Sequence, residues 1–281
     1  MFLIKEKKNL NEQVVFMKIQ APLIAKKAKA GQFIIFRIDE FGERVPLTIA
    51  DFNREEGTIC IIFQAVGKST KMLSTLNEGD YILDVVGPLG APTEFGDAKR
   101  VAVIGGGVGC AIAYPQAKTL HNMGVFVDTI AGFRNRDIVI LEDEFKSVCD
   151  NLFITTDDGS YGKKGFVTDI LKERIEAGAN YDLVIAIGPV PMMKFVSEVT
   201  RSYGIKTIVS LNPIMIDGTG MCGGCRVKVG GEIKFACVDG PDFDGHLVDF
   251  DELIKRNRFY KNEEEHQNGH VCRLTGGVRH G

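Results

Sequence analysis

The chain has 281 residues, of which 44% are hydrophobic and 25% charged, as expected for a globular protein of two domains with a small third. Its net charge of -3 gives no basis for binding to nucleic acid or to an anionic membrane surface. The N-terminus lacks a signal-peptide core, and no apolar run reaches the roughly 20 residues needed to span a bilayer, so we expect a cytoplasmic protein.

Residues 1–97 contain short apolar runs separated by turn residues. The runs begin at Val14, Gln32, Thr58 and Tyr81, and only residues 69–76 have helical spacing. Strands at this spacing predict a small antiparallel β-barrel.

Two polar stretches interrupt the predicted barrel. In residues 44–48 an arginine precedes a proline and a hydroxyl, a combination that can hold a phosphate and hydrogen-bond a planar ring. In residues 66–70 small residues and hydroxyls open the predicted helix, where free N–H groups favour an anion. Each stretch alone also fits a surface ion pair or a helix cap, but together they predict a nucleotide-type cofactor on the barrel.

From Arg100 onward, strands and helices alternate. An apolar run at residues 101–104, the glycine turn at 105–109 and a helix from Cys110 make the first unit of a doubly wound fold. The alternation predicts a parallel sheet over residues 98–212. Further strands are expected at 125–134, 152–156, 183–187 and 207–211, and helices at 141–148, 168–177 and 190–203.

The loops after four of these strands are rich in glycine. Ligands of doubly wound sheets bind at the carboxyl ends of the strands, so these loops predict a crevice for a flat, phosphorylated ligand. Simple strand-to-helix turns would explain one or two of the loops, but not the one with two prolines after Ile187. The candidate residues are Gly106, Gly107, Val108, Gly109, Gly132, Phe133, Arg134, Asp157, Asp158, Gly188, Pro189 and Met192.

Residues 213–281 begin with a cysteine loop. Asp217, Cys222, Cys225 and Cys237 follow the spacing Asp-x4-Cys-x2-Cys-x11-Cys, and six glycines lie between positions 218 and 231. Clustered thiols in a reducing compartment indicate a metal rather than disulfides. Glycine lets N–H groups approach an anionic cluster, which favours iron–sulfur over zinc, since zinc prefers two separated ligand pairs. Three buried free cysteines are the remaining alternative.

The rest of this segment predicts one hairpin and one helix. The alternating residues 226–237 would turn at Gly230 and Gly231 and carry Cys237 back beside the first two cysteines, and residues 249–258 have helical spacing. The polar tail allows a second metal site or a loosely ordered or partner-bound segment. The candidate ligands there are His266, His270 and Cys272, whereas Cys60 and Cys110 are expected in the core.

The order of barrel, nucleotide-binding sheet and cysteine loop resembles the ferredoxin–NADP reductase superfamily with an iron–sulfur extension. Over nearly its whole length the chain is similar to small subunits of the electron-bifurcating NADH-dependent reduced ferredoxin:NADP oxidoreductases. It also resembles the related electron-transfer subunits of dihydroorotate dehydrogenase and sulfide dehydrogenase. The likeness lies in residues 44–48, 67–70, 131–134, 187–193 and 212–225.

This resemblance implies three cofactors: FAD on the barrel, NAD(H) on the middle domain and a 2Fe–2S cluster held by Asp217 and the three cysteines. Thr48, beside the expected flavin N5, is the candidate for tuning the flavin, and Ser69 and Thr70 are expected at the pyrophosphate. The implied FAD-binding residues are Arg44, Val45, Pro46, Leu47, Thr48, Ile62, Phe63, Gln64, Gly67, Ser69 and Thr70.

Two positions depart from the patterns of these families. The superfamily usually has an arginine three residues before the Ser/Thr, where this chain has Val45, and its arginine is one position earlier at Arg44. The dihydroorotate subunits use four cysteines, whereas the first ligand position here is Asp217, which resembles the bifurcating branch.

The resemblance implies an oxidoreductase subunit that passes electrons between NAD(H), FAD and the 2Fe–2S cluster. A larger flavin- or iron–sulfur-bearing subunit would exchange these electrons within a hetero-oligomer, a heterodimer in its simplest form, and ferredoxin would be reached indirectly. One alternative is an electron-transfer subunit of a sulfide or dihydroorotate dehydrogenase. A different class is a non-catalytic, zinc-bearing interaction protein, which would be colourless.

Overall fold

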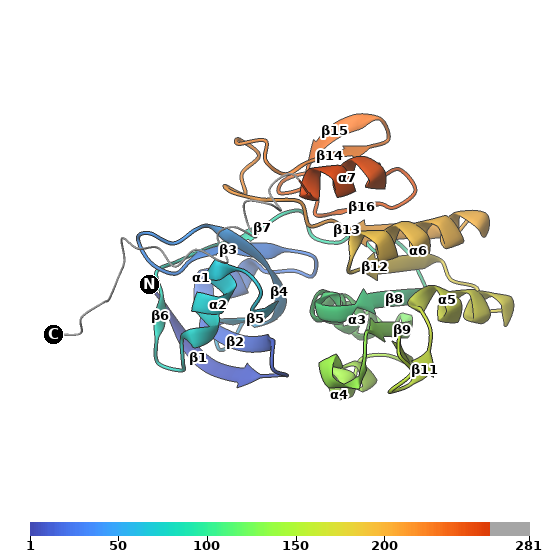
Figure 1. The fold of residues 1–281 in the computed structure, drawn as a ribbon, viewed down its shortest axis with the longest axis horizontal. Coiled ribbons are helices and arrows are strands. Elements are labelled where there is room, and N and C mark those ends of the chain that lie inside the picture. The colour runs from blue at the N-terminus through green and yellow to red at the C-terminus, as the bar shows by residue number, and fades with distance from the viewer. Residues whose placement is uncertain (259–281) are drawn as a thin grey trace.

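The computed structural model describes residues 1–258, which form two seven-stranded sheets and one two-stranded hairpin. The first sheet stands apart from the second, and the hairpin and helix α7 lie along the outer side of the second sheet (Figure 1). In the described part of the chain, no helix is both long enough and apolar enough to cross a membrane.

The first sheet is the predicted antiparallel barrel. Its strand order is β6-β1-β2-β5-β4-β3-β7. Only Leu83 separates β6 at one edge from β7 at the other, so the chain nearly closes the sheet around an apolar core that includes Phe36 and Phe63. The strands are β1 (Phe2–Asn9), β2 (Val14–Gln20), β3 (Phe33–Arg37), β4 (Val45–Asn53), β5 (Thr58–Gln64), β6 (Tyr81–Ile82) and β7 (Asp84–Leu89).

The barrel differs from the sequence-based prediction in two details. The apolar run from Tyr81 forms two strands rather than one, because the chain crosses there from one edge of the sheet to the other. The barrel also has a second helix, α1 (Pro22–Lys27), beside the predicted α2 (Lys68–Thr75). Six residues are too few to show a helical period, and a proline in the first turn sets φ for a helix that sequence spacing does not reveal.

The second sheet has the order β11-β10-β9-β8-β12-β13-β16. All pairings from β11 to β13 are parallel, which confirms the predicted parallel sheet, while β16 joins the edge in the antiparallel sense. The strands are β8 (Arg100–Gly106), β9 (Phe126–Phe133), β10 (Asn151–Thr156), β11 (Lys163–Lys164), β12 (Leu183–Ile187), β13 (Lys206–Ser210) and β16 (Asp242–Asp244).

Helices cover both faces of this sheet. One buried cluster joins the sheet to α3 (Cys110–Asn122) and α4 (Glu142–Lys146), and it contains Cys110 as predicted. A second cluster joins the other face to α5 (Val167–Glu176) and α6 (Val190–Ser202). The strands are therefore buried on both sides, which explains their continuous apolar runs.

The predicted C-terminal hairpin is confirmed. Strand β14 (Arg226–Val229) pairs with β15 (Glu232–Phe235), and Gly230 and Gly231 make the turn with φ values of +60° and +84°. Helix α7 (Phe250–Asn257) follows near the predicted position. Val227, Phe250 and Leu253 belong to the same buried cluster as α5 and α6, so this segment is anchored on the second sheet. The alternative metal ligands in the tail lie outside the described residues.

Candidate functional site

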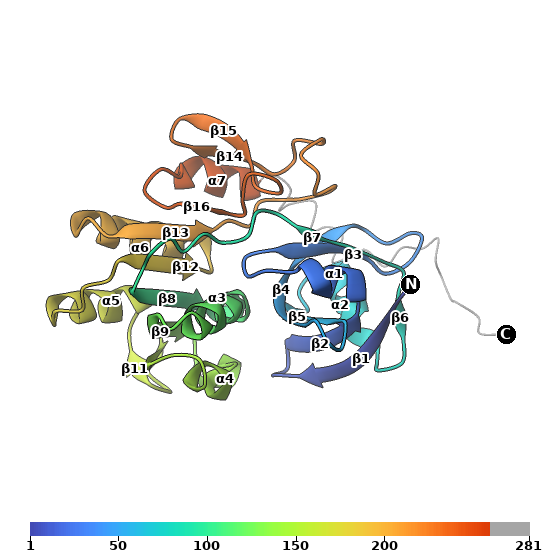
Figure 2. The same ribbon diagram turned by 180° about the vertical axis from the view of Figure 1, so that it is seen from behind.

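The carboxyl ends of the parallel strands point toward the barrel (Figures 1 and 2). Strands β9 and β10 continue the sheet on one side of β8, whereas β12 and β13 continue it on the other. The strand order therefore reverses between β8 and β12, and this switch point is where doubly wound sheets bind their ligands.

The loops that follow β8 and β12 touch each other at the switch point. A Cβ added to Gly109 would lie 2.5 Å from the carbonyl oxygen of Ile187, and one added to Gly106 would lie 2.5 Å from the sulfur of Met192. The same construction on Gly188 meets the Cα of Gly106 at 3.1 Å. The structure thus brings these predicted residues together, and it needs glycine there because the two backbones pack without room for side chains.

The next two loops also lie side by side. The Asp157 N–H donates to the Phe133 carbonyl at 3.0 Å, and the Asp158 N–H donates to the Arg134 carbonyl at 3.3 Å. Ser160 donates its hydroxyl and N–H to the Asp158 carboxylate, and these bonds hold the pKa of that group below its ordinary value. The Phe133 side chain is buried in the core, so this residue has only its backbone to offer a ligand.

On the barrel, strands β4 and β5 separate where the flavin was expected. They pair from Ile49 onward, but residues 45–48 pair with β3 and residues 62–64 pair with β2. In the described structure these two stretches are not paired with each other, and residues 45–48 are half-exposed although they lie in a central strand. Backbone donors and acceptors at such an opening are available to a planar ligand.

The N-terminus of α2 lies beside this opening. The hydroxyl of Thr70 accepts from the N–H groups of Val66 and Gly67 at 3.2 and 3.1 Å, which orders the turn. The hydroxyl of Ser69 donates to the carboxylate of Glu43 at 2.7 Å. Sequence reasoning missed Glu43, although it directly precedes the exposed Arg44, because nothing in the sequence showed that it reaches the helix.

The cysteine loop brings two of its three thiols together in the core. Cys225 and Cys237 are each 1% exposed, and the two thiols are neighbours. Cys222 is exposed at the surface of the loop. Burial, followed by the neighbouring Cys225, raises the pKa of Cys237 to about 12.

Two backbone N–H groups in this loop point at sulfur. Gly220 donates to the sulfur of Cys237 at 3.2 Å, and Gly224 donates to the sulfur of Cys222 at 3.4 Å. N–H donors aimed at cysteine sulfur are the environment that iron–sulfur ligands require. Sulfur donors with these amides therefore fit a cluster, and they give a physical reason for the glycines of the loop.

Asp217 lies at the start of the same loop. Its carboxylate accepts from the N–H of Thr219 at 3.0 Å and from that of Cys222 at 2.9 Å, and these bonds lower its pKa. Among residues 1–258, no three His, Cys, Asp or Glu side chains converge on a single metal-ion position. Of the four predicted ligands, the described structure therefore places Cys225 beside Cys237 and the Asp217 carboxylate on the backbone N–H of Cys222.

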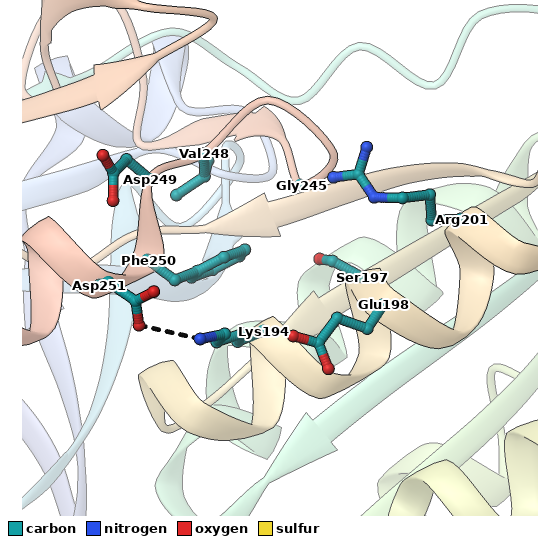
Figure 3. Close-up of a pocket in the computed structure, with 9 residues that line it drawn as sticks. All are labelled: Lys194, Ser197, Glu198, Arg201, Gly245, Val248, Asp249, Phe250 and Asp251. Atoms are coloured by element: carbon teal, nitrogen blue, oxygen red, sulfur yellow. Dashed lines mark hydrogen bonds and ion pairs between the residues drawn. The ribbon is translucent and has the colours of Figure 1, made fainter.

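A hollow of about 260 Å³ lies on the outer side of α6, away from these residues (Figure 3). An ion pair of 2.8 Å between Lys194 and Asp251 crosses it, and acidic and basic side chains are mixed in its lining. None of the predicted site residues lines this hollow, so we do not assign a cofactor to it.

The chain is similar to known redox proteins along almost its whole length. Residues 212–249 match the iron–sulfur cluster binding domain of dihydroorotate dehydrogenase B. A dihydroorotate dehydrogenase B (NAD(+)) electron transfer subunit homolog from Thermotoga maritima is 49% identical over 262 residues, which are 93% of this chain and 92% of that one. The electron transfer subunit from Geobacillus thermodenitrificans is 35% identical over 241 residues, 83% of this chain and 91% of its own.

A solved structure gives the same result in three dimensions. A structure of the NADH-dependent reduced ferredoxin-NADP oxidoreductase, described for flavin-based electron bifurcation, has a chain 47% identical to this one. The TM-score is 0.90, with 96% of this chain and 97% of the other covered. From its sequence, its fold and its cysteine loop, the chain belongs to the family of dihydroorotate dehydrogenase B electron transfer subunits and their homologues, oxidoreductases of the ferredoxin-reductase-like fold.

Proposed function

We propose that the chain is the electron-transferring subunit of an NADH-dependent ferredoxin:NADP oxidoreductase that performs electron bifurcation. FAD binds the barrel (residues 1–97), NAD(H) binds the parallel-sheet domain (98–212), and a 2Fe–2S cluster occupies the cysteine loop of the C-terminal module (213–281). The main support is the N–H···S arrangement at Cys222 and Cys237, in a chain 47% identical to a subunit of such an oxidoreductase.

In this proposal the residues of the chain bind and orient the cofactors, and none of them acts as an acid or a base. FAD held by the barrel would supply the exchange between the two-electron hydride of NADH and the single electrons that a 2Fe–2S cluster carries. The backbone of residues 45–48 and 62–64 would hold the flavin ring, and Thr48 would offer it a hydroxyl. The loops after β8 and β12 orient the pyridine nucleotide toward the barrel, since the strand ends face it.

The proposal includes a larger partner subunit in the cytoplasm, with ferredoxin reached through that partner. The relatives are named electron transfer subunits, a name that implies a second subunit to receive or supply the electrons. Exposed Cys222 lies at the surface of the loop, where a neighbouring protein could approach the cluster.

An anaerobic titration tests the assignment of FAD and NAD(H). Purified full-length chain with its cofactors should lose flavin absorbance on addition of one equivalent of NADH. NADPH should be much less effective under the same conditions. Bleaching by NADPH alone would contradict the assignment of the nucleotide, and a colourless preparation that contains zinc would contradict the redox function.

A second function, electron transfer to dihydroorotate or sulfide chemistry, is supported by the match of residues 212–249 and by the names of the relatives. Asp217 in the first ligand position favours the bifurcating function over this one, because the dihydroorotate subunits use four cysteines as ligands. Isolation of the native complex and identification of its larger subunit decides between the two.

A further inference from the structure

Three side chains from separate parts of the chain form a hydrogen-bonded row that the proposed function does not use. Gln116 on α3 donates its amide N–H to the hydroxyl of Thr93 at 2.6 Å. The same hydroxyl lies 2.5 Å from Oδ2 of Asp242 on β16 and 3.5 Å from the carbonyl oxygen of Ala30 in the barrel. The row therefore connects the barrel, the parallel sheet and the C-terminal segment.

The row lies where the linker between β7 and β8 (residues 90–99) passes next to the C-terminal segment. This linker runs along β16 on its way from the barrel to the second sheet (Figure 2). One backbone bond closes the same junction, because the Ala91 N–H on the linker donates to the Gly240 carbonyl at 2.7 Å. A second bond, from the Leu211 N–H to the Pro241 carbonyl at 2.9 Å, holds the start of β16 on the end of β13.

The polar atoms of this row are not fully paired. Gln116 is 0% exposed, yet its Oε1 has no hydrogen-bond partner in residues 1–258. Asp242 keeps some exposure as a residue, but its Oδ1 is buried and also has no partner there. Two buried, unpaired acceptor oxygens are costly, and a proton on a carboxylate oxygen would reduce that cost.

No cation offsets the charge of Asp242 when it is ionised. The groups that face it are the hydroxyls of Thr93 on the linker and Ser210 at the end of β13, together with the backbone of Gly31 in the barrel. No Lys, Arg or His of residues 1–258 forms an ion pair with it, and Asp244 on the same strand is exposed. Burial accordingly raises the pKa of Asp242 to about 6.

We propose that Asp242 is a proton-binding site that controls how tightly the barrel-to-sheet linker is held against β16. In the protonated state its carboxyl hydrogen bonds to Thr93, and the Thr93 hydroxyl hydrogen is free to turn to Ala30. In the ionised state an uncompensated charge is buried at the junction. Proton uptake therefore closes the junction, and proton loss makes it open more readily.

The sign of this effect follows from linkage. An opened junction exposes Asp242 to water, where its pKa returns to about 3.9, whereas the closed junction holds the pKa at about 6. A group whose pKa is raised in the closed state stabilises that state below the lower pKa, and the stabilisation is lost as the pH rises through the higher one. Linkage then predicts that the opening equilibrium increases about tenfold between about pH 5 and about pH 8.

The inference rests on the proposed function for its consequence. The junction lies between the barrel that would hold the flavin and the segment that would hold the cluster. Its opening would change the separation of these two centres, so the protonation of Asp242 would modulate electron transfer between them.

Amide hydrogen exchange on the full-length chain tests the proposal without reference to activity. A peptide that contains Ala91 reports the N–H group that closes the junction. After correction for intrinsic exchange rates, exchange at Ala91 should rise about tenfold from pH 5 to pH 8 in the native protein. In Asp242→Asn, which keeps the shape but does not titrate, this rise should be absent.

Two further variants make the outcome decisive. Asp244→Asn makes the same chemical change at the exposed position on β16 and should keep the rise of the native protein. Thr93→Val should increase exchange at every pH, because it removes the central hydroxyl. A native protein with no rise, or a rise that persists in Asp242→Asn, overturns the proposal.

Failure of the proposed function gives a different result. Should the purified chain contain no flavin or cluster while the pH-dependent exchange is present, the proton site stands and only its consequence for electron transfer is lost.

Discussion

Glu43 shows how a single acidic residue can act at the N-terminus of a helix. Its carboxylate accepts from Ser69 in the first turn of α2, the position that the proposed FAD pyrophosphate would take. Two anions compete for the same N–H groups and helix dipole, so the carboxylate must move aside when the phosphate binds.

We therefore predict that Glu43→Gln binds FAD more tightly than the native chain does. The expected gain is about fivefold in Kd, which corresponds to about 1 kcal/mol at a helix terminus. Fluorescence titration of flavin-free protein with FAD measures it. Glu40→Gln, an exposed neighbour, should leave Kd unchanged, and weaker binding by Glu43→Gln would show that Glu43 assists FAD.

Asp128 is a buried charge with a structural role. Its side chain is 0% exposed and accepts from Tyr181 at 2.6 Å and Asn151 at 2.7 Å, while Arg100 and Arg174 lie 3.5 Å away. It lies near the amino end of β9, and the proposed nucleotide site is at the opposite, carboxyl ends of the strands.

Asp128→Ala should destabilise the fold by about 3 kcal/mol, because it leaves two arginines and a tyrosine without their shared partner. Urea unfolding measures this change. The exposed Asp143→Ala should stay within about 0.5 kcal/mol of the native chain. Since Asp128 is remote from the proposed cofactor sites, the folded variant should still be bleached by NADH. Loss of bleaching at full occupancy of FAD would place Asp128 in the electron path.

At the scale of elements, α3 is the main contact between the barrel and the parallel sheet. Lys118 on this helix forms an ion pair with Asp51 on β4, with both oxygens at 2.8 Å. The helix starts directly after the glycine turn that meets the loop following β12. One element therefore connects the proposed nucleotide loops to the strand that would hold the flavin.

Gly109→Ala tests the packing of those loops. The new methyl group would overlap the Ile187 carbonyl, so the loops after β8 and β12 must move apart. We expect KM for NADH to rise about tenfold or more, because small displacements of bound groups have large effects on rate and binding. FAD content should not change. Gly204→Ala is the control, since it has a left-handed φ of +66° but meets nothing within 4 Å. An equal rise in KM in both variants would indicate general destabilisation.

At the scale of the whole molecule, the C-terminal segment shares its core with the sheet. Cys225 and Cys237 belong to the same buried cluster as residues of α5 and α6, and β16 completes the sheet edge. A cluster bound there would be held by the fold of the nucleotide-binding part and would keep a constant position relative to it.

Cys225→Ser should remove the proposed cluster without affecting the flavin. Serine in place of a buried thiolate ligand should remove most of the bound iron and the visible absorption of the cluster, because a neutral hydroxyl is a much weaker iron donor than a thiolate. The flavin should still be bound and bleached by NADH. Iron analysis with absorption spectra measures both effects. Cys149→Ser, a half-buried thiol outside the loop, should keep its iron, and unchanged iron in Cys225→Ser would move the cluster elsewhere.

The sequence alone determined the classes of structure and the order of the segments. Short apolar runs separated by turn residues predicted the barrel, and apolar runs that alternate with helical segments predicted the parallel sheet. The spacing of Cys222 and Cys225 and the glycine loops after the strands gave the chemistry of the proposed sites. These signals are local, so no knowledge of the fold was needed to find them.

Only the tertiary structure decided the relations between distant residues. The contact of Glu43 with Ser69, the separation of β4 from β5, the addition of β16 to the sheet and the row from Gln116 to Asp242 join segments up to 149 residues apart. Such contacts depend on how the three segments pack against one another. Long-range packing has no local signature, such as a repeat of apolar residues or a fixed spacing, that could be read from the sequence. The role of a buried polar side chain is therefore visible only in the folded structure, where its partners lie next to it.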